Sequence, residues 1–363
     1  MEQLRIPGPT PLPKEVMQAI CRQMINHRGP EFRQMFKDAT EKLKMFFQTK
    51  NDLLILTCAG TGGLEAAIVN FFSPGDKILG VSIGVFGDRF ISIAKAYGAD
   101  VIPLKFEMGQ AADPDAIKKA LQADPQIKGV IVTHNETSTA VTNNLKAIAP
   151  IVKDAGKLLV VDGVSSIGSI DLPVDELHID VAISGSQKGW MVPPGMVMLS
   201  VSQEAWQANA KAKMPRFYLD IAKAKSSLEK GETPWTPAIS IVYGFSASLD
   251  MMLKEGMQNI FARHALIAKT AREGLKSLGL ALLVKDEKIA SNTVTAVMGT
   301  NGMDTKKLTS IMRDQYKIVL AGGQGALEGK IFRIGHLGLV SLDDIKDVLA
   351  NIKLALPQAG FNK

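Results

Sequence analysis

One lysine stands out as a residue that could carry covalent chemistry. Lys188 lies in the small-residue sequence SGSQK (184–188), directly after the apolar run 181–184. Partial burial lowers the pKa of a lysine, and its neutral amine can then form a Schiff base with a carbonyl compound. The alternative is a solvated surface lysine, which is the usual place for this residue type.

A glycine-rich sequence, CAGTGGLE (58–65), follows another apolar run and precedes a helical pattern. Small residues such as Gly60, Thr61 and Gly62 let backbone amides approach an anion, and the start of a helix adds partial positive charge. The segment therefore predicts a phosphate-binding cup, and the alternative is a tight turn without a ligand. It matches neither GxGxxG nor a P-loop, because no Gly-Lys-Ser/Thr follows.

An acidic residue and a basic residue lie in apolar surroundings. Asp162 ends the apolar run 158–161, where open α/β sheets bind ligands. A buried carboxylate needs a cationic or hydrogen-bonding partner, such as a pyridinium nitrogen, unless it only caps the next helix. Arg333 interrupts the apolar run 331–334, so we expect a carboxylate partner, either from a substrate or from a structural salt bridge.

Two further motifs follow apolar runs. The sequence HNETST (134–139), which includes Thr137, offers hydroxyls and an amide to a ligand, although the same composition favours a local turn. Phe86 lies between two glycines in GVFG (84–87), where it could stack on a flat ring; ordinary core packing is the alternative.

The elements that position these residues alternate along the chain. Apolar runs predict buried strands and are separated by helical patterns; the runs are 53–57, 77–81, 101–104, 129–133, 158–161 and 181–184. This pattern is typical of an α/β sheet covered by helices on both faces. Helical patterns dominate from 203 to 278, and a short α+β segment follows. We expect an N-terminal segment (1–20), a large domain (21–255) and a small C-terminal domain (256–363).

Composition limits the class of protein. The 363 residues include 46% hydrophobic and 21% charged residues, which argues against disorder. The net charge of +6 forms no block, so we expect no nucleic-acid partner. With only two cysteines, Cys21 and Cys58, neither a disulfide framework nor a metal site is predicted. No apolar leader or membrane-length run is present, so we expect a cytoplasmic protein without membrane contact.

Taken in order, these motifs resemble those of a known family. GTGGLEAA (60–67), GVFG (84–87), HNETST (134–139), Asp162, SGSQK (184–188) and RIG (333–335) resemble the alanine–glyoxylate and serine–glyoxylate aminotransferases. These are class V, fold-type-I enzymes dependent on pyridoxal 5′-phosphate (PLP). The resemblance implies a large domain with a mixed, mostly parallel sheet covered by helices, and a small α+β domain. It covers nearly the whole chain.

The resemblance also implies residue roles. Lys188 would hold PLP as an aldimine, and Asp162 would bind the protonated ring nitrogen. The other implied cofactor contacts are Gly60, Thr61, Gly62 and Gln187 at the phosphate, Phe86 and Thr137 at the ring, and Trp235 and Thr236 from a partner subunit. Arg333 would bind the substrate carboxylate. The implied reaction is ping-pong transfer of an amino group from alanine or serine to glyoxylate or pyruvate, in a homodimer with composite sites.

Other functions remain open at this point. A cysteine desulfurase needs a nucleophilic cysteine after its lysine, whereas both cysteines here precede Lys188. A 2-aminoethylphosphonate transaminase, a hydrogenase-associated aminotransferase and a non-catalytic protein that retains the fold are further alternatives. The joint presence of Lys188, Asp162 and Arg333 argues against the last.

Overall fold

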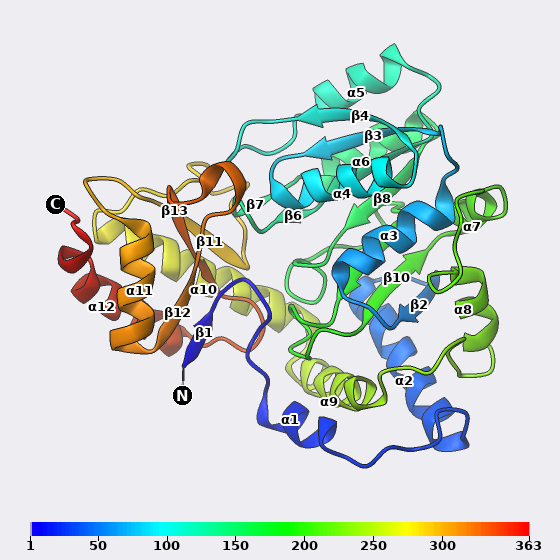
Figure 1. Cartoon of the computed structure of the whole chain (residues 1–363), viewed down its shortest axis with the longest axis horizontal. Helices are drawn as coiled ribbons and strands as arrows, with labels where there is room; N and C mark the ends of the chain where they lie inside the picture. Colours follow the sequence, from blue (N-terminus) through cyan, green and yellow to red (C-terminus); the bar gives the residue numbers. More distant parts are fainter. Residues whose placement is uncertain (1, 363) are drawn as a thin grey trace.

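A computed structural model of the chain describes residues 2–362. A seven-stranded sheet with helices on both faces lies on one side of the molecule, and a smaller four-stranded sheet with its own helices lies on the other (Figure 1). The two parts are built from continuous stretches of chain, except that the N-terminal strand joins the smaller sheet. The α/β class predicted from the sequence is confirmed.

The larger sheet has the strand order β2-β10-β9-β8-β5-β3-β4. Its strands are β2 (Asp52–Leu56), β3 (Lys77–Ser82), β4 (Asp100–Lys105), β5 (Gly129–Thr133), β8 (Leu158–Asp162), β9 (Val181–Gly185) and β10 (Val197–Val201). All neighbouring pairs are parallel except those of β10, which runs antiparallel to both β2 and β9. The mixed, mostly parallel sheet is therefore as predicted.

Both faces of this sheet are buried, and the side chains show it by alternating along a strand. In β2, Leu53 and Ile55 belong to one hydrophobic cluster, and Leu54 and Leu56 belong to the other. Successive side chains of a strand point to opposite faces, so a continuous apolar run fills two cores at once. The covering helices are α1 (Lys14–Ile20), α2 (Pro30–Phe47), α3 (Gly60–Phe71), α4 (Val85–Ala96), α5 (Pro114–Ala123), α6 (Leu145–Asp154), α7 (Gln203–Asn209), α8 (Ile221–Leu228) and α9 (Ile239–Glu255).

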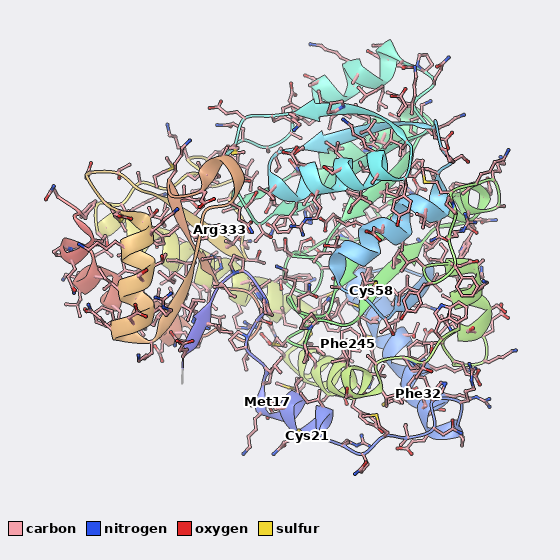
Figure 2. All side chains as sticks on the ribbon, in the orientation of Figure 1. Met17, Cys21, Phe32, Cys58, Phe245 and Arg333 are labelled. Carbon is pink, nitrogen blue, oxygen red and sulfur yellow. The ribbon has the colours of Figure 1, made fainter. Side chains whose placement is uncertain are left out.

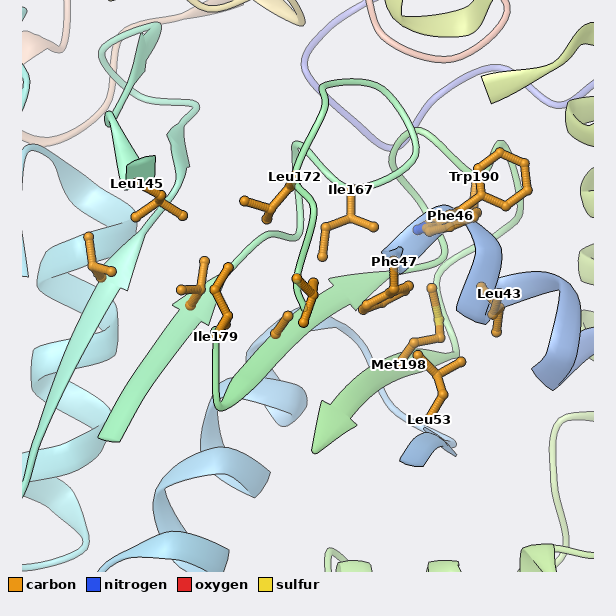
Figure 3. Packing of buried hydrophobic residues seen from close by; sticks show 14 of the residues in the cluster. Leu43, Phe46, Phe47, Leu53, Leu145, Ile167, Leu172, Ile179, Trp190 and Met198 are labelled. Carbon is orange, nitrogen blue, oxygen red and sulfur yellow. The ribbon is translucent and has the colours of Figure 1, made fainter. Parts of the chain in front are cut away.

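The first core contains an aromatic group that fixes the loop after β9. Figure 3 shows Trp190 beside Phe46 and Phe47 of α2. The Trp190 ring is fully buried, its centroid lies 5.6 Å from that of Phe46, and its Nε1 donates to Ser184 Oγ over 2.8 Å. Because Trp190 is two residues after Lys188, this packing also restricts where the lysine backbone can lie.

The smaller sheet has the order β1-β12-β13-β11. Its strands are β1 (Gln3–Arg5), β11 (Val294–Met298), β12 (Ile318–Gly322) and β13 (Ile331–Gly335), and its helices are α10 (Met257–Ser277), α11 (Thr305–Tyr316) and α12 (Leu342–Ala355). Two 3₁₀ turns, η1 (Gly325–Leu327) and η2 (Pro357–Ala359), lie in the same part of the chain. A separate two-stranded pair is formed by β6 (Asn135–Glu136) and β7 (Val141–Thr142). Gly256 separates α9 from α10. The division into 1–20, 21–255 and 256–363 stays a prediction.

Some elements differ from the sequence-based prediction. Helices α2 and α5 and strand β10 were not predicted, and α3 begins at Gly60, inside the glycine-rich segment that was expected to precede the helix. The first turn of a helix tolerates poor helix formers because its amides need no partner inside the helix. The glycine-rich segment is therefore itself the amino end of α3.

Candidate active site

The predicted site residues lie at one edge of the larger sheet. Strands β2, β3, β5, β8 and β9 run in the same direction, so their carboxyl ends share this edge. Asp162 is the last residue of β8, and the loop with Lys188 follows β9. Figure 2 shows Cys58 beside α3 in the larger part and Arg333 in the smaller part, on opposite sides of this region. Ligands of open α/β sheets bind at such an edge.

The amino end of α3 is open toward two loops. Its N-cap residue, Ala59, offers no side-chain acceptor to the first amides. A Cβ on Gly185 would lie 3.6 Å from Gly60 Cα and 3.1 Å from Gln187 Oε1, so these residues converge. Gln187 Oε1 is buried and accepts no hydrogen bond. The uncapped amides at the start of α3 can donate to an anion. Gln187 could donate to the same anion only through its Nε2, because its unpartnered Oε1 is an acceptor.

Thr61 and Gly62 continue this first turn. Thr61 is exposed, and its Oγ1 accepts a hydrogen bond of 3.3 Å from Arg89 Nη1. The Arg89 guanidinium also lies 4.8 Å above the ring of Phe86. Arg89 was not among the predicted site residues, although it is three residues after Phe86 on the same helix. A Cβ on Gly62 would come within 2.8 Å of Cys58 Sγ, so the turn has no room for a larger residue.

Asp162 is a buried carboxylate with few partners. Val164 N donates to its Oδ1 over 3.0 Å, and Thr133 Oγ1 reaches Oδ2 only at 3.5 Å. Burial raises the pKa of Asp162 to about 6, with a smaller contribution from the charge of Glu136. The Val164 contact belongs to a turn and is not the helix cap that the sequence left as an alternative, because no helix lies between β8 and β9; it leaves Oδ2 largely free. A cationic group at Oδ2 would stabilise the ionised form.

Lys188 lies in the loop after β9, with its amine among protein atoms. Its Nζ donates to the carbonyl of Pro7 over 2.5 Å. Burial lowers the pKa of Lys188 to about 8; the charge of Asp162 opposes this effect, and the charges of Arg333 and Arg89 add to it. The four charges therefore influence one another at one place. An amine with this pKa is partly neutral at physiological pH, as a nucleophile must be.

Arg333 of β13 is buried, but it has no acidic partner of its own. Its Nε donates to Gly322 O over 2.9 Å and its Nη1 to Thr137 O over 3.0 Å. Within residues 2–362 no carboxylate oxygen lies within 4.0 Å of this guanidinium, so the structural salt bridge is absent there. Burial lowers the pKa of Arg333 to about 10. The Thr137 contact brings the smaller sheet to the loop after β5.

Phe86 is held by a residue that the sequence analysis did not single out. The carboxylate of Glu136, fully buried, accepts from Phe86 N at 3.1 Å and from Gly87 N at 3.1 Å. Ser138 contributes its amide and its hydroxyl to the same carboxylate. Burial raises the pKa of Glu136. The amino end of α4, and with it the Phe86 ring, is thus fixed against the loop that carries Thr137.

Trp235 and Thr236 lie apart from this group. Trp235 Nε1 donates to Tyr218 O over 3.0 Å, and its ring stacks on Phe217 with centroids 4.9 Å apart. Thr236 is exposed. Tyr218 Oη reaches Thr57 O at 3.4 Å, which places this aromatic group beside the loop that leads to α3. Their expected role across a subunit boundary stays a prediction.

Two negative findings complete the description. In the described part of the chain, no group of three or more His, Cys, Asp or Glu side chains could hold a metal ion. Nor is any helix between residues 2 and 362 long and apolar enough to cross a membrane. A surface hollow of about 670 Å³ lies at the other edge of the sheet and is lined by none of the predicted site residues.

Comparisons with known proteins agree with this arrangement. The family model described as aminotransferase class-V matches residues 4–336. A soluble hydrogenase 42 kDa subunit from Anabaena cylindrica is 45% identical over 98% of this chain and 94% of its own length. A serine–glyoxylate aminotransferase from Methylorubrum extorquens is 36% identical over 98% of this chain and 91% of its own.

A solved structure is similar over nearly the whole chain as well. The pyridoxamine–pyruvate aminotransferase of Mesorhizobium loti superposes with a TM-score of 0.94 at 32% identity, covering 99% of this chain and 93% of that one. The match includes both sheets and the edge at which the candidate site lies. With the family model and relatives above 30% identity spanning the chain, the fold and the type of enzyme are established: the chain belongs to the class V aminotransferases.

Proposed function

We propose that this aminotransferase uses PLP, bound covalently by Lys188, to transfer an amino group from alanine or serine to glyoxylate or pyruvate. The observation that carries the proposal is that Asp162 ends β8 and Lys188 follows its parallel neighbour β9, with the charged groups of both buried at the carboxyl ends of these strands. Both side chains lie at the same edge of the sheet, and each changes the pKa of the other. The names of the relatives, a serine–glyoxylate and a pyridoxamine–pyruvate enzyme, support the substrate class.

The residues at this edge fit PLP in three places. The uncapped amino end of α3 suits a phosphate, and Gln187 beside it would donate to the phosphate through its Nε2. The free oxygen of Asp162 suits a protonated ring nitrogen, because a buried carboxylate with a raised pKa lacks a cation. The amine of Lys188 suits the aldehyde. Phe86 and Thr137 would flank the ring, and Thr61 and Gly62 would complete the phosphate cup.

When bound, PLP supplies an electron-withdrawing ring that stabilises negative charge at the Cα of the amino acid. Asp162 would keep the ring nitrogen protonated, and a protonated nitrogen keeps the ring electron-withdrawing. Lys188 would be a free amine during this step, and burial lowers its pKa to about 8. Lys188 could act first as a base that takes the proton from Cα of the amino acid, and then as an acid that gives this proton to the cofactor.

Arg333 selects substrates with a carboxylate. Its guanidinium has no acidic partner of its own in the described residues, and two of its donors are fixed by the carbonyls of Gly322 and Thr137. A small 2-amino or 2-oxo acid would supply the missing negative charge through a charge-assisted hydrogen bond. Glu136, whose charge acts on Arg333, is occupied by the amides of α4 and does not compete.

The site is proposed to be completed in a homodimer. The aromatic group of Phe217, Tyr218 and Trp235 is partly exposed beside the loop before α3, with Phe217 67% and Tyr218 48% exposed. Exposed clustered aromatic side chains are typical of protein interfaces. Trp235 and Thr236 would then reach the phosphate cup of the other subunit.

A desulfurase function has less support. Cys58, the cysteine beside α3, is partly buried, and burial raises its pKa to about 12. A thiol with such a pKa is a poor nucleophile at neutral pH. A hydrogenase-associated role would add a protein partner but would use the same Lys188 chemistry.

Borohydride trapping tests the proposal directly. The purified chain is incubated with PLP, reduced with borohydride and digested, and the modified lysine is located by mass spectrometry. We expect the modification on Lys188, its loss in Lys188→Ala and its retention in Lys128→Ala, a control at an exposed lysine. A panel of amino donors against glyoxylate and pyruvate then tests the substrates. Trapping at another lysine, or no transfer with any donor, would contradict the proposal.

A further inference from the structure

Residues 6–10 form a segment, here called the N-terminal strap, that runs from the smaller sheet to the Lys188 loop. Its first anchor is β1, which pairs in parallel with β12. Arg5, only 4% exposed, pairs with Asp344 over 2.6 Å and fixes the end of β1 to α12. This half-buried ion pair, together with β1, holds the start of the strap in the smaller part of the molecule.

The second anchor lies on the Lys188 loop itself. Thr10 N donates to Gln187 O over 3.1 Å, and Thr10 Oγ1 donates to Lys188 O over 3.0 Å. Thr10 is buried. The strap therefore ends on the backbone of the two residues proposed to bind the cofactor, and its position depends on both parts of the molecule.

Between its anchors the strap makes two very close approaches. A Cβ on Gly335 would lie 2.2 Å from Ile6 O, so the strap crosses β13 two residues after Arg333. A Cβ on Gly8 would lie 2.7 Å from Lys188 Cδ and 2.8 Å from its Nζ. At Gly335 a Cβ would meet backbone atoms, whereas at Gly8 it would displace the end of the Lys188 side chain. The carbonyl of Pro7 accepts the hydrogen bond from Lys188 Nζ.

We propose that the strap is a positioning element for Lys188, in which the Pro7 carbonyl holds the amine whenever it is not bonded to the cofactor and Gly8 leaves the space that the lysine side chain needs. This inference rests on the proposed function of Lys188. A lysine has four flexible side-chain bonds, and fixing them costs entropy at each use of the amine. A carbonyl at a fixed place holds the side chain in one conformation between uses, so less entropy is lost when the amine reacts.

The arrangement also connects the amine with the proposed substrate-binding strand. Gly335 and Arg333 belong to β13, and the strap lies against Gly335. A movement of β13 that accompanies substrate binding would therefore displace the strap and the carbonyl that holds Lys188.

The experiment compares two glycine variants. Gly8 has φ +107° and Gly75 has φ +81°, so alanine is strained at both positions. A Cβ on Gly75 meets nothing within 4 Å, whereas one on Gly8 meets Lys188. Gly75→Ala therefore measures backbone strain alone. The readout is the rate at which the cofactor-free full chain captures PLP on Lys188, followed by borohydride quenching and mass spectrometry of the Lys188 peptide.

We expect Gly8→Ala to capture PLP at least about tenfold more slowly than wild type, as overpacking of this size implies, and Gly75→Ala to stay within about twofold. Binding of pyridoxamine 5′-phosphate, which cannot bond to Lys188, should be unchanged in both variants. Unslowed capture by Gly8→Ala would overturn the proposal. So would an equal loss of pyridoxamine 5′-phosphate binding, since Gly8 would then only maintain the fold.

Two variants of Thr10 test the second anchor and cover the case in which Gly8→Ala fails to fold. Thr10→Val keeps the shape but removes the hydroxyl that binds Lys188 O, and we expect slower capture with unchanged pyridoxamine 5′-phosphate binding. Thr10→Ser restores the hydroxyl and should restore the rate. Capture of PLP by Thr10→Val at the wild-type rate would contradict the proposed role of the strap. If wild type itself captures no PLP on Lys188, the proposed function fails instead, so the two failures are distinguishable.

Discussion

The Arg333 guanidinium donates through Nη1 to the backbone carbonyl of Thr137, 3.0 Å away, and this bond joins the smaller sheet to the loop after β5. The loop thus lies between the proposed carboxylate-binding cation and the proposed cofactor ring. Substrate binding and the position of Thr137 are therefore coupled through one side chain.

Replacing Arg333 tests whether it binds substrate. Lys cannot reproduce the planar fork that contacts Gly322 and Thr137, so Arg333→Lys should raise KM for amino and keto acids while PLP stays bound. The expected loss in kcat/KM corresponds to about 2–5 kcal/mol. Steady-state kinetics and thermal unfolding are measured on the same preparation, with Arg313→Lys, at an exposed helix position, as control. A lower Tm with unchanged KM would make Arg333 a structural residue.

Asp162→Asn should affect activity and stability in opposite directions. The folded chain raises the pKa of Asp162 to about 6, above the unfolded value near 3.9. Its proton is thus bound more tightly in the folded state, and the resulting stability is complete at low pH and lost as pH rises through about 6. Asn has no charge to bury and so avoids the cost of ionising Asp162 in the folded state. The cofactor-free variant should therefore be more stable than wild type at pH 8 by about 1–3 kcal/mol, and this difference should be smaller at pH 5.

Turnover of Asp162→Asn should fall strongly, because an amide cannot keep a ring nitrogen protonated. Urea unfolding at both pH values, beside Asp154→Asn at an exposed position, gives the stability change. Near wild-type turnover would show that Asp162 serves only in the turn contact with Val164.

Three buried histidines predict sensitivity to acid. Burial lowers the pKa of His134 and His264 to about 4 and that of His336 to about 3. The unfolded chain takes up these protons near pH 6.5, so stability present above that pH is lost as pH falls toward 4. Each histidine adds a slope of up to about 1.4 kcal/mol per pH unit. Urea unfolding from pH 7 to 4.5 should show a smaller slope in His336→Gln but not in His178→Gln, at an exposed site. Equal slopes would contradict this origin.

Subunit complementation tests the composite site. If Trp235 acts on the partner's phosphate cup, mixed dimers of Lys188→Ala and Trp235→Ala contain one intact site, and activity should recover to about a quarter of wild type by random pairing. Mixed Lys188→Ala and Asp162→Asn dimers contain no intact site and should not recover. Light scattering checks the dimer. Recovery in neither mixture, with dimers present, would place Trp235 outside the other subunit's site.

The sequence predicted the sheet well because a strand buried on both faces leaves an unmistakable apolar run. Strand β5 was predicted at its observed bounds, Gly129–Thr133. Strand β10 was not predicted, and its antiparallel direction could not have been, since VMLSV (197–201) is as apolar as its parallel neighbours. Direction depends on how the chain returns to the sheet, which no local pattern records. Helix α2 was missed although Pro30 marks its first turn.

At the site, polar and charged side chains that lie beside apolar runs in the sequence could be predicted. The positions of backbone groups could not. Arg89 was within reach of prediction, because residues three apart share a helix face and Phe86 was already a candidate. Glu136 was also visible as an acid inside a buried motif. The Pro7 carbonyl had no signal, since every residue carries one. Only the path of the chain brings this carbonyl to Lys188.

Helices α3 and α4 both begin beside the candidate site, and Arg89 of α4 reaches Thr61 of α3. Each of the two helix starts could bind a negatively charged group. At α4, however, the chain's own Glu136 already takes the amides of Phe86 and Gly87, whereas α3 has no such internal occupant. Because Glu136 occupies the start of α4, a ligand with one anionic end can bind in only one orientation, with that end at the start of α3. Glu136→Gln, which removes the negative charge at the start of α4, should weaken this discrimination.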